Sequence, residues 1–180
     1  MKPVWIVDDD RSIRLVFEKA LTREGIAYNS FASAREALDA LPGLRWLRLL
    51  YTYPSSVDRR LLEAMAALPR VVPYLDLPFQ HVDDGVLRRM RRGYGGARVR
   101  RIIEEARRRS PGLQLRGTVI SGHPGESAEA HRALLAFVAE AEFEHLGVFP
   151  FSPEEGTAAA RQPDQVPRRT AERRAAELMR

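Results

Sequence analysis

Apolar and polar residues follow one another in blocks along this chain, and the blocks have two different periods. Short apolar runs typical of buried strands recur six times, and each is followed by a stretch with apolar residues at helical spacing. The predicted strands cover 4–7, 26–31, 46–51, 71–75, 113–120 and 146–151. The predicted helices cover 13–21, 34–41, 57–67, 99–106, 127–141 and 167–179, with a shorter helical turn at 86–90. This alternation predicts an α/β fold of six βα units around a parallel sheet.

Capping residues stand where these helices are predicted to begin and end. Asp10 or Ser12 can cap the first helix, and Ser33 can cap the second. Gly25 fits the end of the first helix, and Pro42-Gly43 stops the second.

The composition is that of one soluble globular domain, which we expect to span residues 1–180. Hydrophobic residues make up 44% and charged residues 29% of the chain, which is ordinary for a domain with one sizeable core. No apolar run reaches the roughly 18 residues of a membrane span. The first residues lead directly into a predicted strand without the apolar segment of a signal peptide. We therefore expect a cytoplasmic protein that does not bind a membrane.

The cysteine count and the net charge limit the kinds of functional site that the chain can hold. The chain has no cysteine, which excludes disulfides, thiolate zinc sites, cysteine nucleophiles and cysteine-ligated iron–sulfur clusters within it. The net charge of +5 could indicate nucleic acid, but the arginines stand among glutamates at helical spacing, which favours solvated helix faces. We expect no nucleic acid or other partner, with self-association through an open sheet edge as the alternative.

An acidic run, Asp8-Asp9-Asp10, ends the first predicted strand. Carboxylates at the carboxyl end of a parallel strand stand where open α/β sheets bind ligands, and two or three together favour a hard cation such as Mg²⁺. The alternative is that they cap the next helix and interact with its dipole. The spacing alone leaves both interpretations open.

The segments 4–14, 21–25 and 31–38 resemble receiver domains of response regulators of the nitrogen-regulation class. The resemblance covers residues 1–42 and implies that Asp8 and Asp9 are the pair that holds Mg²⁺. Such receivers also need an aspartate after strand three and a lysine after strand five. The chain has Leu50-Tyr51-Thr52-Tyr53 and Ser121-Gly122-His123 at those places. Receiver phosphorylation is therefore not expected.

Loops rich in glycine, proline and polar residues follow the later predicted strands. They cover 77–92, 121–126, 151–157 and 162–167, and all would lie at the carboxyl edge of the sheet. Glycines there permit close approach of a ligand to the backbone, although such loops are more often ordinary turns. His81 and His123 could bind a metal, but two histidines without a third ligand are poor evidence for zinc.

In order and spacing, these segments resemble the radical-SAM methylthiotransferases that modify a ribosomal small-subunit protein. The resemblance extends over 44–180. It implies that the later strands line a pocket for S-adenosylmethionine, with these residues facing the cofactor or substrate: Gln80, His81, Arg116, Gly122, His123, Gly125 and Glu126. The family also uses a CxxxCxxC loop for a [4Fe–4S] cluster, which this chain lacks. We therefore expect no bound cofactor and no enzymatic activity.

The two resemblances predict different strand orders. A receiver-like start gives an open, doubly wound, flavodoxin-like sheet of order 2-1-3-4-5-6, with residues 1–43 supplying the first two βα units and 44–180 the rest. The alternative is a partial (βα)6 barrel of the radical-SAM type. The two joined resemblances, together with the missing catalytic residues, lead to the hypothesis of a chimeric or designed scaffold without catalytic function. A weak S-adenosylmethionine or nucleotide binder, or a Mg²⁺-binding receiver remnant, are the alternatives.

Overall fold

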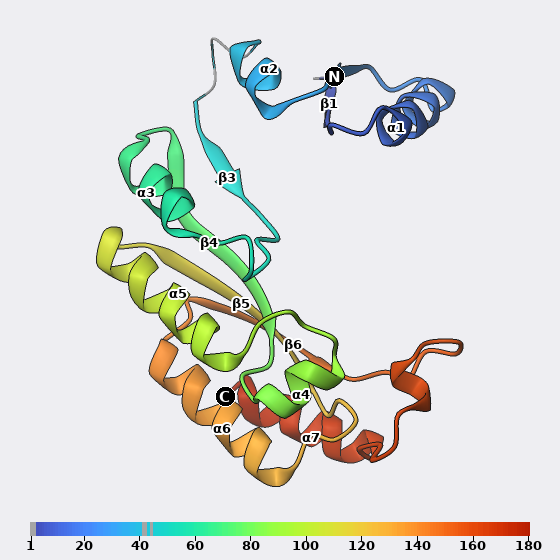
Figure 1. Ribbon diagram of the computed structural model, residues 1–180, viewed down its shortest axis with the longest axis vertical. Helices are drawn as coiled ribbons and strands as arrows, with labels where there is room; N and C mark the ends of the chain where they lie inside the picture. Colours follow the sequence, from blue (N-terminus) through green and yellow to red (C-terminus); the bar gives the residue numbers. More distant parts are fainter. Residues whose placement is uncertain (1–2, 41–42, 44) are drawn as a thin grey trace. The chain divides into compact units, whose positions relative to one another are not determined.

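The computed structural model describes residues 3–40, 43 and 45–180. They fall into two compact units, Met1–Arg45 and Trp46–Arg180 (Figure 1). That the chain forms one domain over 1–180 stays a prediction.

The first unit is a pair of parallel βα units. Its elements are β1 (Val4–Val7), α1 (Arg11–Arg23), β2 (Tyr28–Phe31) and α2 (Ala34–Asp39). β1 and β2 pair in parallel, with Val4 opposite Tyr28. Asp10 accepts a hydrogen bond from the Ser12 amide at 2.7 Å, so the acidic run caps α1 as one of the two sequence interpretations predicted. The helix end predicted at residues 41 and 42 lies outside the described residues.

The second unit is a four-stranded parallel sheet with helices. Its strands stand in the order β3-β4-β5-β6. They are β3 (Leu47–Leu49), β4 (Val71–Gln80), β5 (Gln114–Ser121) and β6 (His145–Pro150). The helices are α3 (Arg59–Ala67), α4 (Asp84–Arg89), α5 (Gly96–Arg109), α6 (Ala128–Ala141), the 3₁₀ turn η1 (Ala159–Arg161) and α7 (Arg168–Leu178).

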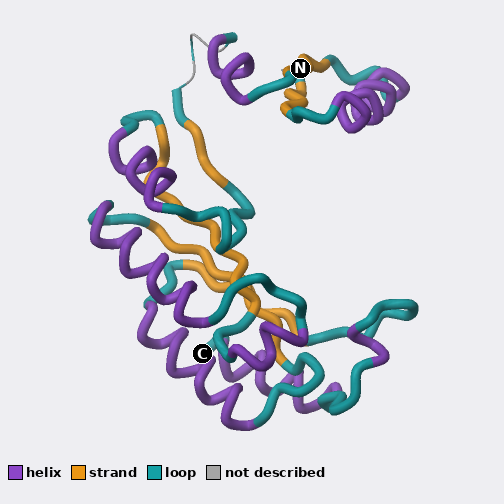
Figure 2. The backbone as a smooth tube through the Cα atoms, viewed as in Figure 1, coloured by secondary structure: helices purple, strands orange, loops and turns teal. Residues whose placement is uncertain are grey.

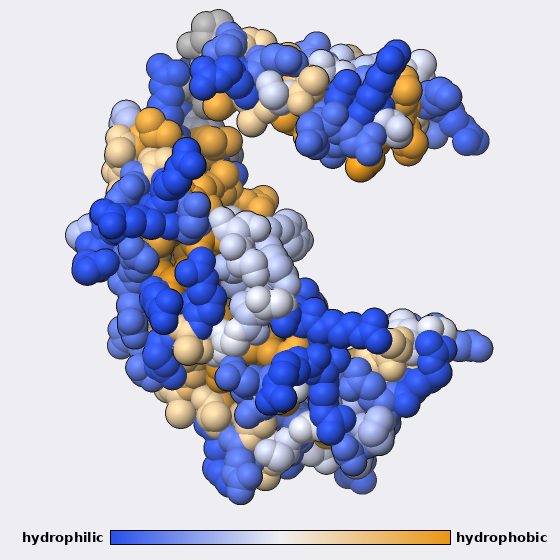
Figure 3. All heavy atoms as spheres, viewed as in Figure 1, coloured by the Kyte–Doolittle hydropathy of each residue, from blue (hydrophilic) through white to orange (hydrophobic). Residues whose placement is uncertain are grey.

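Figure 2 shows helices of this unit beside the sheet, and the hydrophobic core lies between these helices and one face of the sheet. Because successive side chains of a strand point to opposite faces, Leu75, Leu77 and Phe79 of β4 all reach this face, and none is exposed to solvent. They belong to one cluster with apolar residues of α3, α5, α6 and α7. Polar side chains cover most of the surface drawn in Figure 3, with hydrophobic atoms showing between them.

The six predicted strands are present, and all of their pairings are parallel. β4 runs five residues past its predicted end at Leu75. The sequence pattern predicts a loop from Leu77 onward. Pro78 has no amide hydrogen to pair, but the register shifts between Leu77 and Gln80 and the strand continues to Gln80.

The flavodoxin-like order 2-1-3-4-5-6 is not confirmed. Within the described residues, β1 pairs with β2 in one sheet, and β3 to β6 form a second sheet. The partial-barrel alternative is compatible with these pairings. In the described part of the chain, every helix is too short or too polar to cross a membrane.

Candidate functional site at the strand ends

The carboxyl ends of β4, β5 and β6 lie at one edge of the sheet because the three strands are parallel and adjacent. The segments after them carry most of the polar residues that the sequence predicts to be functional. Ligands of α/β sheets bind at this edge, outside the ends of the strands. This edge is therefore the place of the candidate site.

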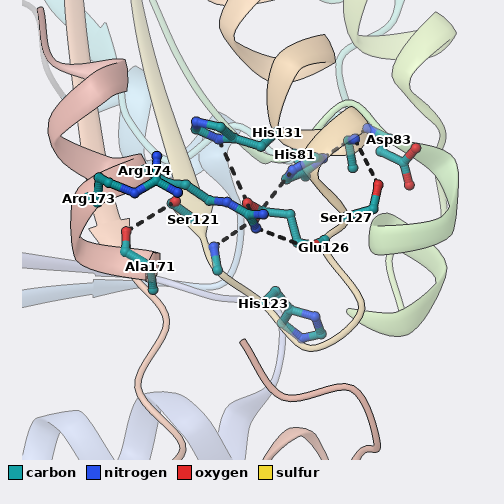
Figure 4. A network of polar contacts seen from close by, with 12 residues as sticks. His81, Asp83, Ser121, His123, Glu126, Ser127, His131, Ala171, Arg173 and Arg174 are labelled. Carbon is teal, nitrogen blue, oxygen red and sulfur yellow. Dashed lines mark hydrogen bonds and ion pairs between the residues drawn. The ribbon is translucent and has the colours of Figure 1, made fainter. Parts of the chain in front are cut away.

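Glu126 is the centre of a buried polar cluster at this edge (Figure 4). Its side chain has no exposed surface. One carboxylate oxygen, Oε2, accepts a hydrogen bond from the Gly122 amide at 2.6 Å. The other, Oε1, accepts from Arg174 Nη1 of α7 at 2.8 Å, and the same nitrogen donates to the Glu126 carbonyl at 2.9 Å. The carboxylate therefore joins the loop after β5 to the last helix.

Two histidine rings complete the surroundings of Glu126. The Nδ1 atom of His81 accepts a hydrogen bond from the Asp83 amide at 2.9 Å, so in the neutral ring the proton is on Nε2. That Nε2 lies 3.6 Å from Glu126 Oε2. His131 of α6 lies with Nδ1 3.8 Å from Glu126 Oε1 and Nε2 2.7 Å from Glu177 Oε2. The Glu126 carboxylate is therefore flanked by His81, the residue after β4, and by His131 of α6.

These contacts decide the charge of Glu126. Burial, the largest influence, by itself raises the pKa of this carboxyl group. The His81 ring, the Gly122 amide and the positive charge of Arg174 together outweigh burial and lower the pKa below its ordinary value of 4.5. Glu126 is thus an ionised carboxylate at neutral pH, and its charge is balanced inside the protein.

The loop that carries Glu126 is also held from its other side. The Gly125 amide donates to the Asp164 carbonyl at 2.9 Å, and Asp164 Oδ2 accepts from Arg89 Nη2 at 3.0 Å. Gly125 has a φ of +83°, and a Cβ at this position would overlap the Arg89 side chain, so glycine is required twice over. The loop is therefore fixed between α4, the segment before α7 and α7 itself.

His123 lies on the same loop but points away from Glu126 (Figure 4). Its Nδ1 lies 3.1 Å from the Pro124 carbonyl oxygen, which assigns the proton of the neutral ring to Nδ1. Its ring packs edge-on against Phe151 at 5.0 Å between centroids. Burial lowers the pKa of His123 below 6.5, against the opposing effect of the Pro124 carbonyl. His123 is therefore a neutral ring at pH 7.

A hollow of about 270 Å³ opens beside His123. Ile120 and Phe151 give it apolar walls, and Arg92 and Gln162 also line it. The Nε atom of Arg92 and the Oε1 atom of Gln162 are buried without a hydrogen-bond partner among the described residues. Gln162 Nε2 donates to the Arg89 carbonyl at 2.9 Å, so its Oε1 is the atom left free to accept. Two residues that line this hollow thus each have a buried polar atom, one a donor and one an acceptor, without a hydrogen-bond partner among the described residues.

Arg116 and Gln80 lie outside the Glu126 cluster, with Gln80 at the carboxyl end of β4 and Arg116 near the amino end of β5. Arg116 is half exposed on β5, on the face opposite to the core, with Nε 4.0 Å from Asp76 Oδ1 of β4. Asp76 is buried, and Oδ1 has no hydrogen-bond partner among the described residues, while Oδ2 accepts from the Tyr51 amide at 3.2 Å. Gln80 ends β4 with a φ of +65°. The structure therefore brings together His81, Gly122 and Glu126, and places Arg116 beside Asp76.

Sequence reasoning missed His131, Arg174 and Asp76. His131 and Arg174 stand within helices at positions that are buried with their apolar neighbours, such as Leu134 and Ala171. The available signal was a polar residue at a position where the helical spacing predicts an apolar, buried side chain. Its partner could not be read from that pattern, because Arg174 and Glu126 are 48 residues apart.

The predicted magnesium ligands Asp8 and Asp9 lie in the first unit. Asp8 Oδ1 accepts from the Asp10 amide at 2.8 Å, and the carbonyls of Asp8 and Asp9 accept from Arg14 Nη1 at 2.7 and 3.2 Å. Over residues 3–40, 43 and 45–180, no group of three or more histidine, aspartate or glutamate side chains is arranged to hold a metal ion. Weak binding of Mg²⁺ by the pair alone stays a prediction.

Comparison with known proteins decides the family. The sequence model of the radical SAM superfamily matches residues 7–138. The chain belongs to the radical SAM superfamily. Its fold neighbours agree with this assignment. Coproporphyrinogen III oxidase from Escherichia coli, a radical SAM enzyme, superposes with a TM-score of 0.58 at 16% identity, over 94% of this chain and 35% of that one. The radical S-adenosylmethionine methyltransferase TsrM from Kitasatospora setae gives 0.51 at 19% identity, over 76% and 30%.

Within the radical SAM superfamily, methylthiotransferases are similar in sequence to this chain. The ribosomal protein uS12 methylthiotransferase RimO of Sorangium cellulosum is 46% identical over 87% of this chain and 32% of its own length. The RimO proteins of Moorella thermoacetica and Aquifex aeolicus are 49% and 46% identical over 79% and 80% of this chain, and over 33% of their own lengths in both cases. The chain thus spans about a third of the length of these relatives.

These findings correct the hypothesis of a receiver-derived chimeric scaffold. The radical SAM match starts at residue 7 and runs through the supposed joint at Gly43, so one family accounts for both sides of it. Nothing in the structure or the comparisons shows a receiver domain. The misleading signal has a physical basis, because an acidic run after a parallel strand also serves as a helix cap, as Asp10 does here. The methylthiotransferase-like part of the resemblance is supported.

Proposed function

We propose that this chain is part of the barrel of a radical-SAM methylthiotransferase and that its strand-end site binds S-adenosylmethionine. The observation that carries the proposal is the hollow beside His123, which is lined by apolar side chains and by Arg92 and Gln162, two residues that each have a buried polar atom without a hydrogen-bond partner among the described residues. A buried polar atom without a partner costs free energy, so a ligand that completes both atoms is favoured.

The chemistry of S-adenosylmethionine fits these groups. An adenine ring offers a flat apolar surface for Ile120 and Phe151, and it has both donors and acceptors on its edge. The methionyl carboxylate is an anion, and the guanidinium of Arg92 suits such a group. When bound in this superfamily, S-adenosylmethionine supplies the reactive alkyl group of a sulfonium. This chain's own residues bind and orient it: Glu126 fixes the loop, and Arg92 and Gln162 complete the contacts.

An iron–sulfur cluster does not fit the residues of this chain. Such clusters are held by cysteine thiolates, and none of the 180 residues is cysteine. We therefore assign to these residues the binding of the nucleoside-containing cofactor and of substrate, and no step of electron transfer. By the names of the relatives, the substrate we propose for the whole protein is a ribosomal protein.

Titration calorimetry of the chain with S-adenosylmethionine tests the proposal, with adenosine and methionine as separate probes. We expect binding of S-adenosylmethionine, weaker binding of adenosine and the weakest of methionine. Arg92→Met should weaken binding about tenfold or more, as expected for a lost hydrogen bond to a charged group. Arg101→Met, an exposed arginine of α5, is the matched control and should bind as the unchanged chain does. Absence of heat at millimolar ligand, or equal effects of the two substitutions, contradicts the proposal.

A further inference from the structure

Arg174 is the only fully charged cation that hydrogen-bonds the Glu126 carboxylate within the described residues. Both side chains are nearly inaccessible to solvent, at 9% and 0%. The same guanidinium nitrogen also holds the Glu126 carbonyl. Arg174 therefore fixes the backbone and the side chain of the residue on which the loop after β5 depends.

The docking of α7 has a separate, apolar basis. Ala171, Ala175 and Leu178 of this helix are buried, and Leu178 belongs to the main hydrophobic cluster. Ala171 also packs directly on Gly122, where a Cβ would overlap the Cβ of Ala171. The helix therefore has apolar contacts with the rest of the unit in addition to the ion pair.

A buried ion pair is weak support for stability. The cost of removing both charges from water offsets much of their attraction, and well-packed apolar residues often replace such a pair without loss. What the pair does supply is a fixed geometry. Arg174 holds Oε1 of Glu126, which leaves Oε2 directed at the Gly122 amide, and that amide stands at the end of β5.

We infer that Arg174 is a positioning residue: through Glu126 it holds the 121–126 loop in its binding geometry, and it couples ligand binding at the strand ends to the docking of α7. The part of the inference that concerns the ligand rests on the proposed function; the part that concerns the loop does not. Coupling of two sites is reciprocal. If α7 docking favours ligand binding, ligand binding must in turn stabilise the docked α7.

Hydrogen exchange of the Gly122 amide tests the loop without any ligand. Arg174→Met removes the charge and keeps most of the side-chain volume, and it should speed exchange of this amide about tenfold or more. Arg174→Lys should restore part of the protection. Arg168→Met is the matched control on the same helix, because Arg168 is exposed and, among the described residues, its one ion pair is with Glu172 at 2.8 Å. Unchanged exchange at Gly122 in Arg174→Met overturns the inference.

Two further measurements separate positioning from general stability. Arg174→Met should unfold at the lowest temperature, because it leaves the Glu126 carboxylate buried without its cation. At a temperature at which all three variants are folded, Arg174→Met alone should bind S-adenosylmethionine about tenfold more weakly. Adding S-adenosylmethionine to the unchanged chain should slow exchange of the α7 amides, and this effect should disappear in Arg174→Met. If Arg174→Met does not fold, Glu126→Gln, which keeps the volume, takes its place with the same expectations.

The outcomes distinguish this inference from the proposed function. If the unchanged chain does not bind S-adenosylmethionine, the proposed function fails, and the exchange of Gly122 still decides whether Arg174 positions the loop. If the chain binds but all arginine variants bind equally well, the proposed function stands and the inference fails.

Discussion

Arg174 Nη1 lies 2.8 Å from Glu126 Oε1, and this contact joins two residues that are 48 positions apart in the chain. Neither side chain would be buried alone, because an unpaired charge in the interior is strongly unfavourable. Burial of the two charges is compensated because they pair with each other. In addition, the Gly122 amide donates to the Glu126 carboxylate, and the Glu126 carbonyl accepts from Arg174. The pair therefore ties the end of a core strand to the last helix.

Glu126 should make the free energy of unfolding of the protein depend on pH in the acidic range. Its pKa in the folded protein is lowered below 4.5, so its contribution is fully present above that value and is lost as the pH falls through the folded pKa. Glu126→Gln should lower the free energy of unfolding by about 3 kcal/mol at pH 6, since it leaves Arg174 buried without a full partner. The difference from the unchanged chain should shrink below pH 4.5, as measured by urea unfolding.

Glu129→Gln is the control for this series. Glu129 lies on α6 near Glu126 in the chain. Its side chain is 87% exposed, and its Oε1 lies as far as 3.9 Å from Nη2 of its partner Arg132. Exposed pairs of this kind contribute little, so its removal should change stability by less than about 1 kcal/mol at any pH. A pH-independent difference for Glu126→Gln would contradict the assigned charge.

Gly122 should tolerate no side chain. It has a φ of +78°, and a Cβ there would overlap Ala171 of α7. Gly122→Ala should therefore combine backbone strain of about 1 kcal/mol with a clash that separates the loop from the helix. Gly112→Ala isolates the strain, because Gly112 has a φ of +84° with nothing within 4 Å of its Cβ position. Thermal unfolding should show a larger loss for Gly122→Ala, and equal losses would exclude the clash.

His81 and His123 should be opposite tautomers. The Asp83 amide donates to Nδ1 of His81, which places its proton on Nε2, and the Pro124 carbonyl accepts from Nδ1 of His123. Long-range ¹H–¹⁵N correlation spectra at pH 8 distinguish the two forms, with each ring serving as the reference for the other. The same tautomer in both rings would contradict the described hydrogen bonds.

Leu115 should be among the most sensitive core positions. It is fully buried between the sheet and its helices, so Leu115→Ala should lower the free energy of unfolding by about 2–5 kcal/mol. Leu68→Ala is the control, because Leu68 is 52% exposed and should cost no more than about 0.5 kcal/mol. Urea unfolding measures the free energy of unfolding of both variants. Similar losses of free energy in the two would show that Leu115 is not a core residue.

The elements were predictable from the sequence, but their assembly was only partly so. Hydrophobic periodicity located all six strands within a few residues. The largest difference is the end of β4, which lies at Gln80 and was predicted at Leu75. The strand order followed from a local resemblance of residues 1–42 and is not confirmed. A run such as Asp8-Asp9-Asp10 is compatible with several parallel α/β folds, since capping and metal binding use the same carboxylates at the same place. The family match over residues 7–138 uses far more of the chain.

The candidate site was likewise only partly predictable from the sequence. Gly122, Glu126 and His81 could be proposed because they stand in loops after strands, where parallel topology gathers residues at one edge. His131 and Arg174 stand inside helices, and their roles depend on contacts with residues far away in the chain. Arg116 was placed correctly on a strand but lies beside Asp76 and not in the Glu126 cluster.

The sequence by itself determined where strands and helices form, that they alternate, and that no thiolate is available in these 180 residues. These properties depend on local periodicity and on composition. Only the tertiary structure decided which polar side chains meet in the interior. A buried charge is stable only with a partner at hydrogen-bond distance, and Glu126 finds that partner through the packing of α7 on the end of β5.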